Sequence, residues 1–334
     1  MTRASSMSEV ARVAGVSAQT VSRVLSDHPN VNAATRAKVR AAVERTGYRR
    51  NRLARALVTG RSRIVGVVTH ETDAYSTSAI LLGVQTAARA AGYFVSTATT
   101  SSLSAAPIAQ AVGRLMDQGV DGLVIAVPVR EDASLGDVTR DLPTVVVDGM
   151  RASATEVVAI DQVEAGRVAT EHLLALGHQT VWHVAGPESW NDAIGRTSGW
   201  RAALEDAGRE VPPVLYGDWT PGSGYRNGAL VGRMPEVTAL FVASDEMAFG
   251  AIRALVELGR RVPDDVSVVG MDDIALAAYA SPPLTTVRQP FHDMGRRAVE
   301  HVLALVADPE TVHEPEVVHP QLVVRGSTAA AASR

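Results

Sequence analysis

The sequence predicts a small helical head followed by a long α/β body built on parallel, doubly wound sheets. Charge divides the chain first: residues 1–63 contain 12 Arg, one Lys and three acidic residues, a net charge of +10, whereas residues 64–334 have a net charge of −14. The pattern also changes near residue 64, from short helical stretches to apolar runs of strand length that alternate with amphipathic helical stretches. A basic head on an acidic body indicates that one end of the chain meets a polyanion.

Composition excludes several classes of protein. The 334 residues include no cysteine, which excludes a disulfide scaffold, a cysteine zinc site, an iron–sulfur cluster and a thiol nucleophile. The hydrophobic fraction of 46% excludes wholesale disorder, and no apolar run approaches the roughly 18 residues of a membrane span. Because the start of the chain lacks the apolar core of a secretory signal, we expect a cytoplasmic protein with no membrane partner.

Motifs of catalysis and metal binding are missing from the sequence. It has no P-loop, no G-x-G-x-x-G, no H-E-x-x-H and no G-x-S-x-G, and its nine histidines form no metal-binding pattern. We therefore expect a protein that is not an enzyme and that holds no cofactor and no metal.

Three helices are predicted in the head. Residues that cap helices precede each of them, at Ser6, Ser17 and Asn32, and glycines end the first and third, at Gly15 and Gly47. Apolar residues at helical spacing give the helices their inner faces: Val10, Val13 and Ala14, then Val21, Val24 and Leu25, then Val39, Ala42 and Val43. Two short helices joined by a tight glycine-containing turn, with a third as support, form a helix-turn-helix.

The second helix of this unit is the predicted reader of a DNA groove. Ala18, Gln19, Ser22 and Arg23 face away from its apolar side. Gln19 can pair with adenine and Arg23 with guanine, each through two hydrogen bonds, while Ala18 can pack on a thymine methyl group. The alternative is that these are plain surface residues.

The stretch Glu9–Val24, EVARVAGVSAQTVSRV, closely resembles the headpiece of LacI/GalR-family transcriptional regulators. The resemblance implies a headpiece over residues 1–50, a homodimer, and a near-palindromic double-stranded DNA operator as partner. In the family, the positions of Ala18, Gln19 and Arg23 contact bases. The predicted DNA-binding residues of the headpiece are Ser17, Ala18, Gln19, Thr20, Ser22 and Arg23.

Residues 48–57, YRRNRLARAL, resemble the hinge helix of the same family, which orders when two subunits meet on DNA. We assign residues 51–63 to this hinge and its linker, with Asn51 and Arg52 among the DNA-binding residues. Leu57 matches a leucine that the family inserts into a minor-groove step, and Ala54 permits close approach of the paired helices. An ordinary linker leucine is the alternative for Leu57.

From Ile64 the body alternates between two kinds of element. The predicted strands are residues 64–69, 94–98, 122–127, 144–148, 181–185, 239–243 and 267–271, and the predicted helices include residues 78–91, 106–118, 163–176, 193–207, 246–258 and 294–306. The family resemblance implies that this body, residues 64–334, is a periplasmic-binding-protein-like core of two Rossmann-like lobes joined by three crossovers. The first lobe then spans about 64–161 and 289–320, and the second about 162–288 and 321–328.

Polar residues follow several of these strands, where α/β sheets bind their ligands. Asp148, Asp245, Asp272 and Asp273 each stand at such an end, and a carboxylate there can accept hydrogen bonds from two adjacent sugar hydroxyls. For Asp245 we favour a helix cap, and for Asp273 a structural role.

The resemblance extends the set of effector-binding residues to both lobes. By alignment with the family, Ala74, Ser76, Thr77 and Ile80 form the wall of the first lobe, and the remaining positions are Asp148, Asp192, Arg196, Trp219, Ser244, Asp272, Gln289 and Phe291. Core packing for Trp219 and ion pairing for Arg196 are the alternatives, and Trp190 either stacks on a sugar or lies in a surface loop. Ser244 stands where a close relative has asparagine, and Asp192 where it has serine.

Taken together, the residues and the resemblance predict a sequence-specific repressor released from its operator by a small sugar, such as a galactoside or another glycoside. The alternatives are a regulator whose ligand strengthens DNA binding, and a sugar-binding protein without a regulatory role. The final residues lack the leucine heptads of a tetramerisation helix, so we expect a dimer. We also expect DNA binding to weaken steeply with salt, because the paired heads carry many phosphate-binding cations.

Overall fold

The computed structural model describes residues 6–48, 60–72, 74–127, 139, 142–147, 156–311 and 316–331. Its contacts divide the chain into two compact units, Met1–Ser62 and Arg63–Arg334. The predicted contacts of Asn51, Arg52, Ala54, Leu57 and Asp148 lie outside the described residues.

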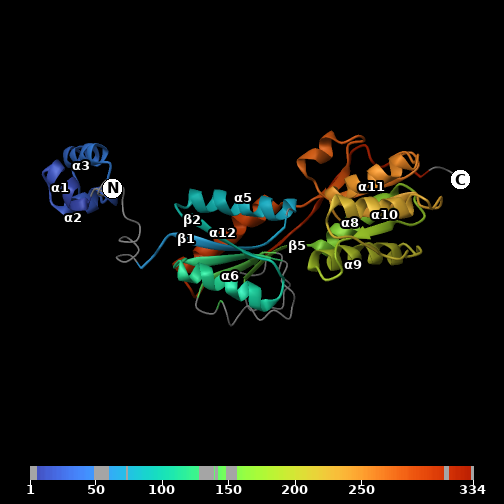
Figure 1. Ribbon diagram of the computed structural model, residues 1–334, viewed down its shortest axis with the longest axis horizontal. Coiled ribbons are helices and arrows are strands. Elements are labelled where there is room, and N and C mark those ends of the chain that lie inside the picture. The colour runs from blue at the N-terminus through green and yellow to red at the C-terminus, as the bar shows by residue number, and fades with distance from the viewer. Residues whose placement is uncertain are drawn as a thin grey trace. The chain divides into compact units, whose positions relative to one another are not determined.

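The first unit contains three helices, α1 (Met7–Ala14), α2 (Ala18–Leu25) and α3 (Ala33–Thr46), drawn in blue in Figure 1. Each predicted cap is present: the side chains of Ser6, Ser17 and Asn32 accept hydrogen bonds from backbone N–H groups three residues ahead, at 3.2, 3.1 and 2.7 Å. Gly15 and Gly47 end α1 and α3 with φ near +60°, a conformation that glycine adopts without strain.

The core of this head differs from the prediction chiefly in α1. Val10, Val21, Val24, Val39 and Ala42 are buried as predicted, and Ala11 is buried with them. The other predicted inner residues are only partly buried: Val13, Ala14, Leu25 and Val43. The reason is that α1 packs against both α2 and α3, so two adjacent residues face inward in place of one narrow stripe.

The second unit contains two six-stranded sheets, each covered by helices on both faces, as predicted (Figure 1). The first sheet has the order β11-β5-β4-β3-β1-β2, and all of its pairs are parallel. Its strands are β1 (Ile64–His70), β2 (Phe94–Thr100), β3 (Gly122–Ala126), β4 (Thr144–Val147), β5 (Glu156–Ile160) and β11 (Glu316–Val318).

Strand β4 shows why these strands read as unbroken apolar runs. Val145 and Val147 pack with α5 (Tyr75–Ala90) and α12 (Phe291–Ala307), whereas Val146 packs with α6 (Ala105–Asp117) on the opposite face. Both faces are therefore dry, which is the usual condition of a parallel sheet.

The second sheet has the order β12-β10-β9-β8-β6-β7, and only β12 among the described strands runs antiparallel to its neighbour. Helices α8 (Gln162–Ala175) and α9 (Asn191–Asp206) pack on one face, and α10 (Pro221–Val231) and α11 (Asp245–Glu257) pack on the other. The strands are β6 (Trp182–Ala185), β7 (Leu215–Tyr216), β8 (Ala239–Val242), β9 (Ser267–Asp272), β10 (Thr285–Arg288) and β12 (Gln321–Val323), and a 3₁₀ helix follows β9 (Ala275–Tyr279).

The chain passes between the two sheets three times. It leaves the first sheet after β5 to enter α8, returns after β10 to form α12, and crosses again between β11 and β12. No helix of the described residues is long and apolar enough to cross a membrane.

His183 occupies the dry interior of the second lobe. Its ring stacks on Phe241 with centroids 4.5 Å apart and lies 5.3 Å from Trp200, and Nδ1 donates to the Phe241 carbonyl at 3.1 Å. Burial lowers the pKa of His183 to about 3, from an ordinary value of 6.5.

Acidification is therefore expected to destabilise this lobe through His183. The unfolded chain takes up a proton below pH 6.5 that the folded chain excludes until about pH 3, so stability falls as pH falls through this window. At pH 4.5 the loss is about 2–3 kcal/mol. Urea unfolding at pH 7 and pH 4.5 measures it: His183→Phe should show a smaller loss on acidification than the wild type, and the exposed His319→Phe the same loss. Equal losses in all three proteins would contradict the assignment.

Candidate functional site

The exposed face of α2 carries the predicted base-reading residues. Ala18, Gln19 and Arg23 are exposed, whereas Thr20 and Ser22 are partly buried. The Ser17 hydroxyl lies 2.9 Å from the Thr20 hydroxyl and accepts the Thr20 N–H, so these two side chains fix the start of the helix. The head thus presents an amide and a guanidinium side by side on one helix, the donors and acceptors that read base edges in a major groove.

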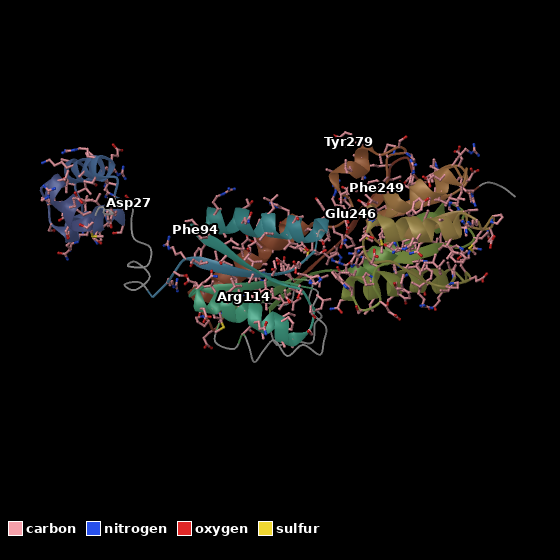
Figure 2. All side chains as sticks on the ribbon, in the orientation of Figure 1. Asp27, Phe94, Arg114, Glu246, Phe249 and Tyr279 are labelled. Carbon is pink, nitrogen blue, oxygen red and sulfur yellow. The ribbon has the colours of Figure 1, made fainter. Side chains whose placement is uncertain are left out.

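A cleft lies in the second unit, lined by residues of both lobes. Figure 2 shows Glu246 on the side of the second lobe that faces the first. The lining residues are Ala74, Ser76, Trp190, Asp192, Arg196, Trp219, Ser244, Glu246 and Asp272.

The topology explains why residues so distant in sequence meet here. Ser244 follows β8, Asp272 is the last residue of β9, and Ala74 lies between β1 and α5. The carboxyl ends of parallel strands share one edge of a sheet, and the crossovers bring the corresponding edges of both lobes to the cleft.

Arg196 is the cation of the cleft lining and is held from several sides. It is 3% exposed, its Nη1 donates to the Ala243 carbonyl at 2.6 Å, and its Nε donates to Gln162 at 2.8 Å. Asp192 forms an ion pair with Nη2 at 3.7 Å, and the guanidinium lies 5.4 Å from the ring centre of Trp219. A guanidinium fixed in this way offers its remaining N–H groups to a ligand without further loss of side-chain entropy.

Two tryptophans form an aromatic corner in the cleft. Trp190 and Trp219 meet edge to face with centroids 5.7 Å apart, and His70 of the first lobe lies 5.6 Å from Trp190. The indole N–H of Trp219 is buried and has no hydrogen-bond partner among the described residues. This corner provides apolar faces for the C–H surface of a sugar ring and a buried donor for one of its oxygens.

The backbone of Trp219 is also unusual, because its φ is +69°. The ring lies against Gly186, where an added Cβ would come within 2.1 Å of Cη2. A strained backbone held by close packing is typical of residues whose position is functional.

Three carboxyl groups line the same cleft. Burial raises the pKa of Asp272 well above its usual range, although Arg196 and the donating amide of Gln289 oppose that shift. Burial likewise raises the pKa of Asp192 and of Glu246, which accepts the backbone N–H of Tyr75 from the first lobe. Buried carboxyl groups gain from additional hydrogen-bond donors, and adjacent hydroxyl groups supply such donors.

The structure brings seven of the predicted effector residues to the cleft lining. They are Ala74, Ser76, Asp192, Arg196, Trp219, Ser244 and Asp272. Gln289 is not among the lining residues, but its side-chain amide donates a hydrogen bond to Asp272, which is. Ile80 and Phe291 are not brought there: their side chains are buried in the apolar core beneath the first sheet, because α5 and α12 turn these positions toward each other.

Two corrections concern the first turn of α11. The predicted cap at Asp245 is wrong: Ser244 is the N-cap and its hydroxyl accepts the Met247 N–H at 3.2 Å. Asp245 lies inside the helix, where its carboxylate accepts from the Thr286 hydroxyl at 2.6 Å and from the Ile274 N–H at 2.9 Å. Burial raises its pKa to about 7.

Asp273 and Arg196 both form the ion pairs expected of a structural role. Asp273 forms ion pairs with Arg288 and Arg325 at 2.7 and 2.6 Å. Arg196 pairs with Asp192, as the structural alternative predicts, and it also lines the cleft.

Sequence reasoning missed Glu246 and Gln162. Glu246 directly follows the candidate residue Asp245 at the start of a helix after a strand, and this position could have identified it as a cleft residue. Gln162 carries no signal in the sequence. Within the described ranges, no group of three or more His, Asp or Glu side chains is arranged to hold a metal ion.

Gly186→Ala should displace Trp219 and weaken the binding of any cleft ligand, because the added methyl group overlaps the indole ring. We expect a loss of about 1–3 kcal/mol in the free energy of unfolding, the usual cost of overpacking. Chemical unfolding followed by tryptophan fluorescence measures it. Gly222→Ala is the matched control, since its Cβ would meet nothing closer than 3.7 Å. Wild-type stability and fluorescence in Gly186→Ala would contradict the packing.

Comparison with known proteins relates both units to one family. The pattern of the family described as "Bacterial regulatory proteins, lacI family" matches residues 6–51, and that of the periplasmic binding protein-like domain matches residues 170–328. The chain is 36% identical over 332 residues to the HTH-type transcriptional regulator CelR of Thermobifida fusca, covering 95% of this chain and 96% of the relative. It is 33% identical over 329 residues to the lactose operon repressor of Escherichia coli K12, covering 96% and 90%.

Solved structures agree with these relatives. The lac repressor dimer bound to operator and the anti-inducer ONPF matches with a TM-score of 0.90 at 33% identity, covering 98% of this chain and 100% of that one. A complex of the regulator CelR with cellobiose matches with a TM-score of 0.72 at 34% identity, covering 97% and 99%. With its helix-turn-helix head and two-lobed core, the chain belongs to the lacI family of bacterial DNA-binding transcriptional regulators.

Proposed function

We propose that this regulator is a repressor, and that a small sugar or glycoside binding in the cleft releases it from its operator. The observation that supports this proposal is the cleft itself, where Arg196, Asp272 and the buried indole N–H of Trp219, which has no hydrogen-bond partner within the described ranges, converge from separate elements. A guanidinium, a carboxyl group and an aromatic face together suit the hydroxyls and the C–H surface of a sugar ring. The CelR–cellobiose complex and the lac repressor with bound ONPG support this choice of ligand class.

On the DNA side, we propose that two subunits place their α2 helices in the halves of a near-palindromic operator. Gln19 and Arg23 read base edges, while Ser17, Ala18, Thr20 and Ser22 complete the contact surface. Asn51, Arg52, Ala54 and Leu57 bind at the operator centre. The lac repressor dimer on operator DNA supports this arrangement. A DNA partner implies a cytoplasmic protein.

A second mode, in which ligand strengthens DNA binding, has one observation in its favour. HTH-type transcriptional repressors named PurR, such as that of Proteus mirabilis at 32% identity, are also among the relatives. The ligand lowers operator affinity in the first mode and raises it in the second, so measuring operator affinity with and without ligand separates the two modes.

The test begins with the operator. Duplexes selected from a random pool by the full chain give the DNA probe, and a thermal-shift screen of mono- and disaccharides gives the ligand, because a ligand of the folded core raises its melting temperature. Operator affinity is then measured with and without that sugar. We expect about 5- to 150-fold weaker binding at saturation. Tighter binding would establish the second mode, and a sugar that binds without changing operator affinity would contradict both.

A further inference from the structure

Two glutamines stand where the chain passes between the lobes. Gln162 lies two residues beyond β5 of the first sheet and opens α8 of the second lobe, and Gln289 follows β10 of the second sheet just before α12 of the first lobe. The side-chain amide of Gln162 donates to the amide oxygen of Gln289 at 2.9 Å. Two crossovers that run in opposite directions are thus joined by one side-chain hydrogen bond.

Each of the two side-chain amides also forms a hydrogen bond with a residue of the cleft lining. Arg196 Nε donates to Oε1 of Gln162 at 2.8 Å, and Nε2 of Gln289 donates to Oδ1 of Asp272. The bonds form a directed chain, Arg196 to Gln162 to Gln289 to Asp272, in which each amide accepts at one end and donates at the other. Because the Arg196 guanidinium can only donate, Gln162 must turn its amide oxygen toward it, and the amide nitrogen of Gln162 then faces the amide oxygen of Gln289.

Burial makes this chain costly to interrupt. Arg196, Gln289 and Asp272 are 3%, 4% and 9% exposed and Gln162 is partly buried, so water does not readily replace a partner lost by one of the three buried members. A buried donor or acceptor left without a partner carries the full cost of its desolvation.

We propose that Gln162 and Gln289 are positioning residues that connect occupancy of the cleft to the spacing of the two crossovers, and so to the arrangement of the lobes. The proposal rests on the ligand response proposed above. A ligand that bonds to Arg196 and Asp272 holds both ends of the chain, and the glutamines hold the crossovers to those ends. A lobe arrangement that keeps the chain intact then gains from the ligand, and this difference between arrangements is what drives a response.

Gln162→Glu is the sharpest variant, because it breaks only the central bond. The carboxylate still accepts from Arg196 Nε, but it has no N–H for Gln289 and sets an oxygen against its amide oxygen. Gln179→Glu is the matched control: this exposed glutamine bonds Arg209 at 2.9 Å with the same kind of acceptor. Gln289→Met is a second variant, which removes the amide and keeps the length of the side chain.

The experiment uses the full chain, its selected operator duplex, and cellobiose and lactose as probes. Calorimetry gives the sugar affinity, and operator titrations with and without saturating sugar give the ratio of operator affinities. We expect Gln162→Glu and Gln289→Met to lower that ratio by about tenfold, with a much smaller change in sugar affinity, and Gln179→Glu to match the wild type. The double variant should lose no more than either single variant, because each breaks the same chain.

Three results overturn the inference. A wild-type ratio in Gln162→Glu at saturating sugar removes the coupling and leaves the proposed function standing. Losses that add in the double variant show two independent effects and also remove it. If the wild type itself binds both sugars and shows no change in operator affinity, the proposed function fails first and the inference fails with it.

Discussion

Asp272→Ala should abolish the response to sugar while leaving operator affinity in the absence of sugar nearly unchanged. The side chain lines the cleft, is buried, and stands at a φ of +108° that directs it across the carboxyl edge of the second sheet. Removing one member of a buried hydrogen bond costs about 1–3 kcal/mol, so losing two such bonds to ligand hydroxyls weakens sugar binding by more than about thirtyfold. Calorimetric titration with the sugar found in the thermal-shift screen measures this loss.

The neighbouring carboxylate provides the control. Asp273→Ala removes ion pairs to Arg288 and Arg325 outside the cleft lining, so it should lower stability and retain the sugar response. Asp272→Asn keeps the shape of the side chain and an oxygen for the Gln289 amide but replaces the second carboxyl oxygen, so it tests whether shape alone supports the sugar response. A retained sugar response in Asp272→Ala would remove this residue from the site.

Leu57→Ala has the second largest expected effect, this time on DNA. If the side chain enters a minor-groove step at the operator centre, its loss removes an apolar wedge and the kink that depends on it. We expect operator binding to weaken by about 2 kcal/mol or more, and binding to a random duplex to change little. Competition titrations with the selected operator and a scrambled duplex give both numbers.

Arg55 belongs to the segment that resembles the hinge helix, and we expect it to contact a DNA phosphate, so Arg55→Ala separates a wedge from a general contact with DNA. A phosphate contact carries no sequence information, so this variant should weaken operator and scrambled duplex alike. Equal losses on both duplexes for Leu57→Ala would identify that leucine as an ordinary linker residue.

The head was predictable because its signals are local. All three helices begin directly after their predicted capping residues, and α1 and α3 end at the predicted glycines. The burial of Ala11 in place of Ala14 was not predictable, because it depends on how α1 crosses two other helices.

The sheets were predictable where strands are buried on both faces. All seven predicted strands are present, and five of them, β1, β3, β4, β8 and β9, are runs of mostly apolar residues; the other two are β2 and β6. Strand β5 begins with Glu156, β10 is TTVR, and β7, β11 and β12 have only two or three residues, so none of them stands out from a loop. Their pairing is decided by the sheet that receives them.

The cleft was predictable at strand ends and much less so along helices. The rule for α/β sheets points to Asp272, and the family resemblance to Arg196 and Trp219, and all three line the cleft. Ile80 and Phe291 lie on helices whose rotation is set by their packing against each other's elements, which single-sequence patterns do not contain. The role of Gln162 depends on a partner 127 positions away.

The interlacing of the two lobes has a consequence for the order in which the protein is made. The head is complete once residue 62 has been synthesised, and its helices need nothing that follows. The first sheet waits for β11 and the second for β12, which both lie near the end of the chain. Domains tend to fold as units during synthesis, so a nascent or prematurely ended chain carries a finished DNA-binding head and no finished core. Such a fragment would have the helix-turn-helix that contacts DNA and would lack the core to which we assign the ligand response.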